Sequence, residues 1–350
     1  MEKQLISFIK HLIDEKEAMI DNFRKIRMDL TTKNYTTAKM NINQDKNNFT
    51  DVLSSEETRV ILSPNEYGSD YINANWIFNK YIATQHPYNT STMNTMNTMN
   101  TTNTMNTLNT VNDFWKMIYD TNTTMILNLD GSTDYIPNVG ETIGYGAITV
   151  SIEKQHTNKN LVIRYIKLKH SEMGNRFVLH ITYHNWPDKQ IPTEIEFINL
   201  LNFINMLDTE TKAQIVVHCQ AGIGRTGTFI CIYEVIQRLT KGEIPDILDI
   251  IRKMRTARIG MVQNKCQLQF ALLMILHSAK EYLNKLSSEK KVKKKNKLAM
   301  SCGDEHLMPT PLEKKVKNKL TMSCGESYMY ISKEDHEVNQ FSLYSPLSEA

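Results

Sequence analysis

A cysteine and an arginine stand close together in a short, glycine-containing stretch of this sequence. Residues 214–228 read Gln-Ile-Val-Val-His-Cys-Gln-Ala-Gly-Ile-Gly-Arg-Thr-Gly-Thr and include Cys219 and Arg225. Gly222 and Gly224 allow a tight backbone curl that residues with a Cβ resist. Such a curl above a helix N-terminus turns several N–H groups inward, which makes a site for a phosphate-sized dianion. The same field favours the thiolate form of Cys219. A thiolate in such a cradle is a nucleophile for phosphorus.

The residues on either side of this loop predict the elements that hold it. Residues 215–217 form an apolar strand-type run, and apolar side chains recur at helical spacing from residue 229 onward. Cys219 would then end a strand, and Arg225 would begin a helix. Further strand-type runs lie at 71–77, 81–85, 125–129, 148–152, 161–168 and 177–183. Helical spacing occurs at 1–30, 113–119, 194–207, 245–254 and 267–282.

Composition and charge limit the class of protein. The chain has 350 residues, 41% of them hydrophobic, and a formal net charge of +3, so we expect one large α/β domain with tails and no basic core. Its five cysteines are few and odd in number, which predicts free thiols in a reducing compartment, with Cys231 and Cys266 in the core. We expect no signal peptide and no membrane span, because no window approaches the ~20 apolar residues that a span needs.

Composition shifts at two places along the chain and thereby indicates domain boundaries. Residues 89–112 consist mainly of Met-Asn-Thr and Thr-Asn-Thr triplets, which offer little to bury and predict a solvated loop inserted in the domain. Residues 286–350 are rich in lysine and serine, and the segment that begins at Asn296 recurs at Asn318. We expect one domain over residues 1–285 and a mostly disordered tail after it.

The loop around Cys219 resembles the signature loop of the cysteine-dependent phosphatases. The resemblance rests on His218 and Cys219, followed after five residues by Arg225 and Thr226, within the strand and helix context described above. Rhodanese folds and small arsenate reductases also build anion loops around a cysteine. The loop by itself therefore leaves the class of enzyme open, and the rest of the chain separates these possibilities.

A second motif lies upstream of the cysteine. Trp186, Pro187 and Asp188 stand where the tyrosine-specific members of the family carry a mobile acid loop. A phenolate leaving group has a conjugate acid with a pKa near ~10, so a positioned carboxylic acid that protonates it should help by about 10²–10⁴-fold. Asp188 fits this role.

Two further stretches resemble binding loops of the same family. Residues 46–52 resemble the phosphotyrosine-recognition loop, in which Phe49 would stand for the usual tyrosine and wall the substrate pocket. Asp51 would hold the backbone amides of the substrate peptide. Residues 263–267 resemble the glutamine loop, whose two amides, here Gln263 and Gln267, order the water that hydrolyses the phospho-enzyme.

Residues 70–75 and 84–87 also match core motifs of these phosphatases, so the resemblance covers about residues 20–283. It implies a single protein tyrosine phosphatase domain with a central twisted mixed sheet and helices on both sides. It also implies phosphotyrosine-containing proteins as substrates and neither a metal nor a cofactor for the chemistry.

The mechanism that this resemblance implies has two steps. Cys219 attacks phosphorus while Asp188 protonates the tyrosine oxygen, and Asp188 then takes a proton from a water that Gln263 places. Arg225 and the loop N–H groups would hold the phosphoryl oxygens. Thr226 would donate to the departing thiolate, and His218 would orient the loop. The proposed substrate contacts are Phe49, Asp51, Gln220, Ala221, Gly222, Ile223, Gly224 and Gln267.

Several positions depart from the family pattern. Asn48 replaces an arginine, His86 a glycine and Ile136 a tryptophan, and Lys189 and Gln190 replace the aromatic residue and glycine that normally follow the acid. The segment 129–135 is too short for the usual hairpin, whose glutamate braces the signature arginine. We therefore expect lower turnover than in a full-length family member.

Two other functions remain open. A weakly active phosphotyrosine trap would bind substrates without useful turnover, although it would most cheaply lose Cys219, Arg225 or Asp188, and all three are present. An RNA 5′-phosphatase would share the signature loop and suit a basic tail, but such enzymes lack the loops described above. Nucleic acid is therefore not the partner we expect.

The reduced hairpin, the Asn/Thr/Met-rich insertion and the single domain are similar to the phosphatases that bracoviruses of parasitoid wasps deliver into insect cells. This resemblance implies a place in the host cytoplasm and an action on host phosphotyrosine signalling. The lysines between Lys290 and Lys297 predict either a solubilising tail or a nuclear-import or anionic-surface patch. The sequence leaves the oligomeric state and the physiological substrate undetermined.

Overall fold

The apolar runs of the sequence pair into one sheet in the computed structural model. Across the described residues, which are 1–26, 33–64, 68–88, 110–211 and 214–301, nine strands follow the order β1-β2-β3-β9-β4-β8-β7-β6-β5. Their bounds are β1 (Arg59–Ile61), β2 (Tyr71–Ile77), β3 (Tyr81–Gln85), β4 (Met125–Asn128), β5 (Thr142–Tyr145), β6 (Ile148–Asn158), β7 (Leu161–His170), β8 (Gly174–Tyr183) and β9 (Ile215–Cys219).

The middle of the sheet is parallel and its two edges are antiparallel. Strand β9 pairs in parallel with β3 and with β4, and β4 pairs in parallel with β8. Antiparallel pairs add β2 and β1 at one edge and β7, β6 and β5 at the other. The sheet is therefore mixed, as expected.

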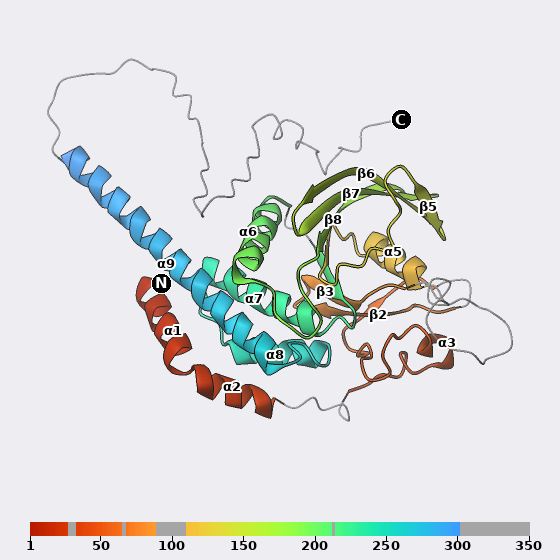
Figure 1. Ribbon diagram of the computed structural model, residues 1–350, viewed down its shortest axis with the longest axis horizontal. Coiled ribbons are helices and arrows are strands. Elements are labelled where there is room, and N and C mark those ends of the chain that lie inside the picture. Colours follow the sequence, from red (N-terminus) through yellow and green to blue (C-terminus); the bar gives the residue numbers. More distant parts are fainter. Residues whose placement is uncertain (27–32, 65–67, 89–109, 212–213, 302–350) are drawn as a thin grey trace, which may run out of the picture. The chain divides into compact units, whose positions relative to one another are not determined.

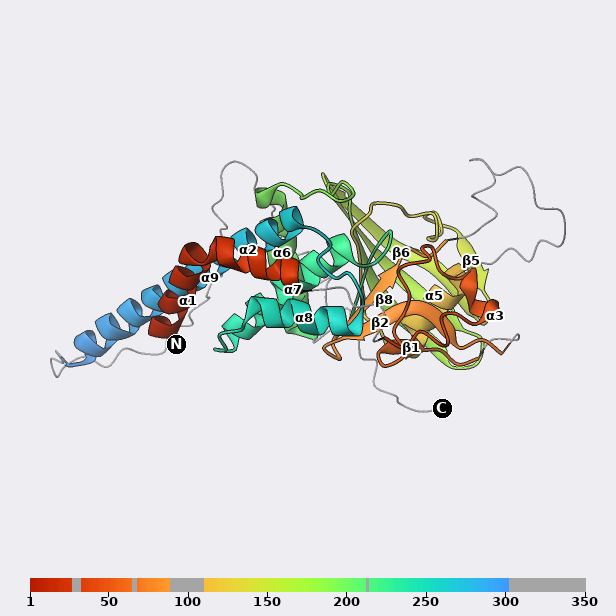
Figure 2. The same cartoon turned by 90° about the horizontal axis from the view of Figure 1, so that it is seen from below.

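Helices cover both faces of the sheet in the unit Met1–Ser288 (Figures 1 and 2), and a second unit begins at Glu289. The helices are α1 (Glu2–Asp14), α2 (Lys16–Lys25), α3 (Asn41–Gln44), α5 (Thr110–Asp120), α6 (Glu194–Thr211), α7 (Gly224–Thr240), α8 (Ile247–Ala257) and α9 (Lys265–Ser301). Alternate residues of β9 explain the two layers. Ile215 and Val217 join the apolar cluster of α6, α7 and α8, whereas Val216 joins the cluster of α5.

The parallel arrangement brings four chain segments to one edge of the sheet. Carboxyl ends of parallel strands share an edge, where open α/β sheets place their ligands. Strand β9 ends at Cys219, β3 at Gln85, β4 at Asn128 and β8 at Tyr183. The signature loop, the short segment 129–135 and the acid loop therefore begin side by side.

Two helices extend past the segment limits that composition predicted. Helix α5 begins at Thr110 and so takes the last residues of the predicted insertion, of which 89–109 lie outside the described residues. Helix α9 continues to Ser301, past the predicted tail boundary at residue 286, because the lysines and glutamates there are good helix formers. The rest of the predicted tail lies outside the described residues.

Side-chain burial corrects one further expectation. Cys231 is fully buried, but Cys266 is exposed, because it lies on the outer face of the first turn of α9. No helix among the described residues combines the length and apolarity needed to cross a membrane.

Phe197 on α6 tests how the core supports the acid loop. Its ring is fully buried and packs edge-on against Trp186 and Phe270. Phe197→Ala should lower the free energy of unfolding by about 3–5 kcal/mol, measured by urea denaturation. Phe177→Ala, at a ring that is 46% exposed, is the matched control and should change it by no more than about 0.5 kcal/mol. Equal losses in the two variants would contradict this account of the core.

Candidate active site

The sulfur of Cys219 lies at the end of β9, directly before the loop that leads into α7. Its residue is 3% exposed, and the Thr226 hydroxyl donates a hydrogen bond to Sγ over 3.2 Å. A hydroxyl in this position stabilises negative charge on sulfur. The arrangement suits a cysteine that must attack and later leave as a thiolate.

The loop carbonyls are held by the buried guanidinium of Arg258. Its Nε donates to the Gly222 carbonyl and one terminal nitrogen to the Ala221 carbonyl, both over 2.9 Å, and the other terminal nitrogen donates to Asn75 Oδ1 over 2.8 Å. Burial lowers the pKa of Arg258 to about 10, so it remains a cation at neutral pH. Because these carbonyls point toward Arg258, the N–H groups of the loop point to the opposite side. An anion-binding loop requires this arrangement.

Gly222 has the backbone conformation that the curl needs. Its φ is +67°, and a Cβ added there would lie 2.2 Å from the Thr84 carbonyl oxygen of β3. The loop therefore packs directly on the neighbouring strand, and glycine is the residue that fits.

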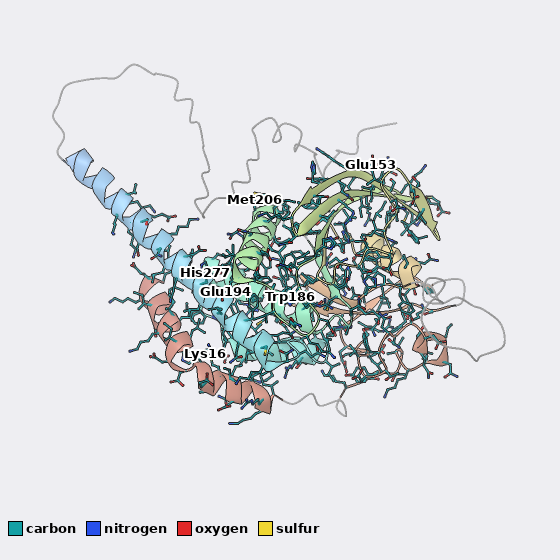
Figure 3. All side chains as sticks on the ribbon, in the orientation of Figure 1. Lys16, Glu153, Trp186, Glu194, Met206 and His277 are labelled. Atoms are coloured by element: carbon teal, nitrogen blue, oxygen red, sulfur yellow. The ribbon has the colours of Figure 1, made fainter. Side chains whose placement is uncertain are left out.

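Arg225, at the start of α7, contacts the acid loop. Its terminal nitrogens lie 3.0 Å from the Trp186 carbonyl oxygen and 3.0 Å from Asp188 Oδ1. Trp186, labelled in Figure 3, is 2% exposed and packs edge-on against Phe197 and Phe270. The acid loop thus stands over the signature loop, with the Asp188 side chain 61% exposed.

The further contacts of Arg225 show what holds its guanidinium in place of the glutamate that the family resemblance implies. One terminal nitrogen also reaches the Leu129 carbonyl oxygen at 3.4 Å, and the buried Nε has no hydrogen-bond partner. Within the described part of the chain, the acidic group that Arg225 meets is Asp188 itself. The short segment 129–135 therefore supplies a backbone carbonyl and no carboxylate to the guanidinium.

Two glutamines approach the same loop from the start of α9. The Gln263 backbone N–H donates to Gln267 Oε1 over 2.9 Å, and a Cβ on Gly224 would lie 3.0 Å from the side-chain amide of each glutamine. Gln263 is exposed and Gln267 is fully buried. Both amides therefore lie beside the beginning of α7, and Arg255 fixes the preceding backbone through the Met261 carbonyl.

The loop of residues 46–52 is anchored to the end of β3. Gln85 accepts from the Asn48 N–H over 3.0 Å and donates to the Lys46 carbonyl over 2.7 Å. Phe49 remains 39% exposed and Asp51 is exposed. The two side chains assigned to substrate recognition are thus available to a ligand on an otherwise fixed loop.

His218 is fully buried behind Cys219. Its Nε2 lies 2.6 Å from the Tyr135 hydroxyl, which also lies 2.7 Å from His180 Nε2. Burial lowers the pKa of His218 to about 3, so the ring is neutral. A neutral ring held by Tyr135 suits an orienting role and does not exchange protons with a substrate.

His86 fills space beside the shortened segment. Its Nδ1 lies 3.0 Å from Asp130 Oδ2 and its Nε2 2.7 Å from Asp134 Oδ1. Burial alone would lower the pKa of His86, but the hydrogen bonds with both carboxylates outweigh it and raise the pKa to about 9. Sequence reasoning noted His86 as a departure but missed these partners. It also gave Arg258 no individual role, although an arginine at the end of an apolar helix was a usable signal.

Gly222→Ala should weaken the binding of inorganic phosphate about tenfold or more, because a left-handed conformation costs an alanine about 1–3 kcal/mol and its Cβ would meet the Thr84 carbonyl. Isothermal titration calorimetry measures the affinity. Gly144→Ala is the control, since its Cβ would meet nothing within 4 Å. An unchanged affinity in Gly222→Ala would show that the loop does not form the cradle.

Comparisons with known proteins agree with this geometry. The family described as protein-tyrosine phosphatase matches residues 43–277. Tyrosine-protein phosphatase non-receptor type 20 of Mus musculus is 29% identical over 252 residues, which are 67% of this chain and 54% of that protein. Receptor-type tyrosine-protein phosphatase C of Homo sapiens is 28% identical over 282 residues, which are 75% of this chain and 20% of that protein.

The chain thus spans about half the length of the mouse relative and a fifth of the human one. The family match nevertheless covers more than half of this chain and includes the loop of Cys219, the acid loop and the glutamine loop. The chain belongs to the protein-tyrosine phosphatase family.

Proposed function

We propose that this protein hydrolyses phosphotyrosine in proteins through a cysteinyl-phosphate intermediate. The observation that carries the proposal is the meeting of Cys219, Arg225 and Asp188 at one loop, with Thr226 on the sulfur and Asp188 3.0 Å from the Arg225 guanidinium. A nucleophile, an anion-binding fork and a carboxyl group are the parts that cleavage of a phosphate monoester requires.

In the first step the Cys219 thiolate forms a bond to phosphorus as the bond to the tyrosine oxygen breaks. Asp188 gives its proton to that oxygen, and the phosphoryl group stays on sulfur. The loop N–H groups and the guanidinium of Arg225 hold the three equatorial oxygens, where charge spreads in the transition state.

In the second step Asp188 acts as a base and takes a proton from a water molecule. Gln263 and Gln267 lie where their amides can place that water, beside Gly224 of the loop. Water oxygen bonds to phosphorus, the Cys219 thiolate leaves, and the Thr226 hydroxyl stabilises it over the 3.2 Å contact.

One contact favours slow turnover as a second candidate behaviour. Arg225 is paired with Asp188 and lacks a partner on Nε. A substrate phosphate must exchange that pair for its own contacts, and the acid must then move to the leaving oxygen. A phosphotyrosine trap with little turnover would share every binding contact and differ only in this exchange.

The finer cellular role is also a proposal. The resemblance to bracovirus phosphatases in the reduced hairpin, the Asn/Thr/Met-rich insertion and the single domain supports an action on the phosphotyrosine signalling of a host, in the host cytoplasm. Nuclear import through Lys290–Lys297 stays a prediction from sequence.

Substrate class is tested with a phosphotyrosine peptide, a phosphoserine peptide and a 5′-triphosphate RNA in steady-state assays. The wild type should turn over the first alone, and Cys219→Ser should lose this turnover while it keeps binding the peptide. The physical reason is that Phe49, 39% exposed on the loop of residues 46–52, offers its ring to the aryl group of phosphotyrosine. In cultured insect cells the wild type, and not Cys219→Ser, should lower total phosphotyrosine.

If the wild type binds the phosphotyrosine peptide tightly but does not turn it over, the protein is a phosphotyrosine trap and the proposed enzymatic activity is rejected. Equal or greater activity on RNA would overturn the tyrosine assignment. Unchanged cellular phosphotyrosine together with turnover in vitro would leave the enzyme established and reject the host role.

Asp188→Asn separates the acid from the binding contacts. On the phosphotyrosine peptide kcat should fall about 10²–10⁴-fold, because the phenolate then leaves without a proton. The loss should shrink on aryl phosphates with more acidic phenols. Asp249→Asn, at a partly exposed carboxylate of α8 that pairs with Lys253, should leave both rates unchanged. A loss independent of the leaving group would reject Asp188 as the acid.

A further inference from the structure

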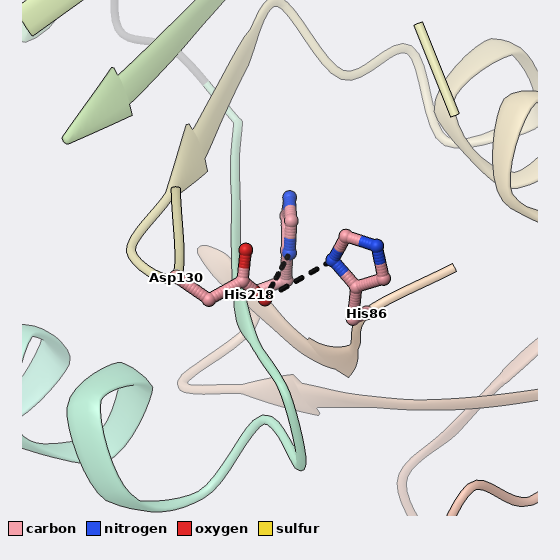
Figure 4. Close-up of side chains that lie close together, drawn as sticks. All are labelled: His86, Asp130 and His218. Carbon is pink, nitrogen blue, oxygen red and sulfur yellow. Dashed lines mark hydrogen bonds and ion pairs between the residues drawn. The ribbon is translucent and has the colours of Figure 1, made fainter. Parts of the chain in front are cut away.

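Two histidine rings meet at one carboxylate behind the signature loop. His86 Nδ1 lies 3.0 Å and His218 Nδ1 4.0 Å from the same oxygen, Oδ2 of Asp130 (Figure 4). These three donor atoms lie within 4.8 Å of one another. They come from the ends of three adjacent strands, since His86 follows β3, Asp130 follows β4 and His218 lies in β9.

The outer nitrogen of each ring is already held by an oxygen. His86 Nε2 lies 2.7 Å from Asp134 Oδ1, and His218 Nε2 lies 2.6 Å from the Tyr135 hydroxyl. Metal-ligating histidines characteristically have the second ring nitrogen held in this way, which fixes the orientation of the ring. Both rings are thereby turned with Nδ1 toward Asp130.

Hydrogen bonding alone explains His86 but not His218. The His218 ring is fully buried, and its Nδ1 has no hydrogen-bond partner. A buried polar atom left unsatisfied costs about 1–3 kcal/mol. Asp130 Oδ2 lies 4.0 Å from this nitrogen, which is beyond hydrogen-bond distance.

We propose that His86, Asp130 and His218 bind a divalent transition-metal ion, with Zn²⁺ the best fit. Two imidazole nitrogens and a carboxylate oxygen are ligands that suit zinc. Zinc bonds of about 2.0–2.2 Å in a tetrahedral site place the donors about 3.3–3.6 Å apart. The observed separations from Asp130 Oδ2 are 3.0 Å and 4.0 Å, on either side of that value, and the three donor atoms lie within 4.8 Å of one another, so the donors must draw together to hold the ion.

The ion takes the position of a proton. Without metal, His86 donates the hydrogen on Nδ1 to Asp130, and the metal replaces this hydrogen, which passes to solvent. Asp134 keeps its hydrogen bond to His86 Nε2. Its side chain is 46% exposed, so the ion, and a water molecule as fourth ligand, would enter the site from this side.

Bound metal would join three segments of the active site. The His218 carbonyl accepts from the Leu129 N–H over 3.0 Å, and the Leu129 carbonyl contacts Arg225. The ion would thus tie the residue before Cys219 to the segment behind the guanidinium. No step of the proposed phosphoryl transfer uses it. Binding to the folded state alone should raise the unfolding temperature.

The test uses the full chain with Cys219→Ser, so that the catalytic thiolate cannot hold the metal. Titration with Co²⁺ should give one ion per chain, with visible absorption bands of a low-symmetry nitrogen and oxygen site and no sulfur-to-cobalt charge transfer. Zn²⁺ should displace the cobalt and raise the unfolding temperature. X-ray absorption on the zinc form should show nitrogen and oxygen neighbours only.

Variants locate the ion. His86→Gly and Asp130→Asn, each in the Cys219→Ser background, should weaken Co²⁺ binding at least about a hundredfold. His156→Ala, at an exposed histidine of β6, should bind as tightly as its parent. Circular dichroism checks that each variant is folded, and Asp130→Asn serves if His86→Gly is not.

Three outcomes would overturn the proposal: no cobalt bound by the Cys219→Ser chain, a sulfur-to-cobalt band, or binding that survives in the folded Asp130→Asn variant.

Discussion

The guanidinium of Arg258 is a fully buried cation whose hydrogen bonds go to two carbonyls of the signature loop and to one asparagine of β2. Burying such a charge costs several kcal/mol unless its donors are satisfied. Here the loop accepts two of the three hydrogen bonds and Asn75 the third, so the shape of the loop and the burial of the cation depend on each other. The same charge lies near Cys219 and favours an anion above it. The Arg258 guanidinium therefore both fixes the shape of the loop and supplies positive charge near Cys219.

The parallel strands at the centre of the sheet make the rest of the site possible. Their carboxyl ends lie at one edge, so the loops that follow β9, β4 and β8 meet without long excursions. The Arg225 guanidinium contacts the loops after β4 and β8, because it donates to the carbonyls of Leu129 and Trp186 and to the carboxylate of Asp188. The Arg225 side chain thus binds both the short segment and the acid loop. This shared contact couples the position of Asp188 to the anion site.

The short segment 129–135 has its own internal support. Asn128 Oδ1 accepts from the N–H groups of Asp130 and Gly131, and the Asp130 and Asp134 carboxylates clasp His86. Glycine at position 86 would leave both carboxylates without this partner. The short segment thus turns its two acids toward His86, the residue after β3, and neither of them contacts the guanidinium of Arg225.

The sequence by itself determined the elements with strong local signals: the strand, loop and helix around Cys219, the runs of β2 and β3, and the apolar helices. It determined these because side-chain periodicity and glycine placement are local properties. Short edge strands such as β1 and β5, the start of α5 and the end of α9 lacked such a signal. The residue types of the site were readable for the same reason, since nucleophile, acid and amides each stand in a recognisable motif.

Only the tertiary structure decided what those residues meet. The pairing of Arg225 with Asp188, the grip of Arg258 on the loop and the convergence of His86, Asp130 and His218 join positions far apart in the chain. Contacts of this kind arise from strand order and packing, which no local pattern encodes. The cysteine and its loop were recognisable within fifteen residues, whereas the contacts that hold the loop come from Arg258 after α8 and from the packing of Gly222 on Thr84 of β3.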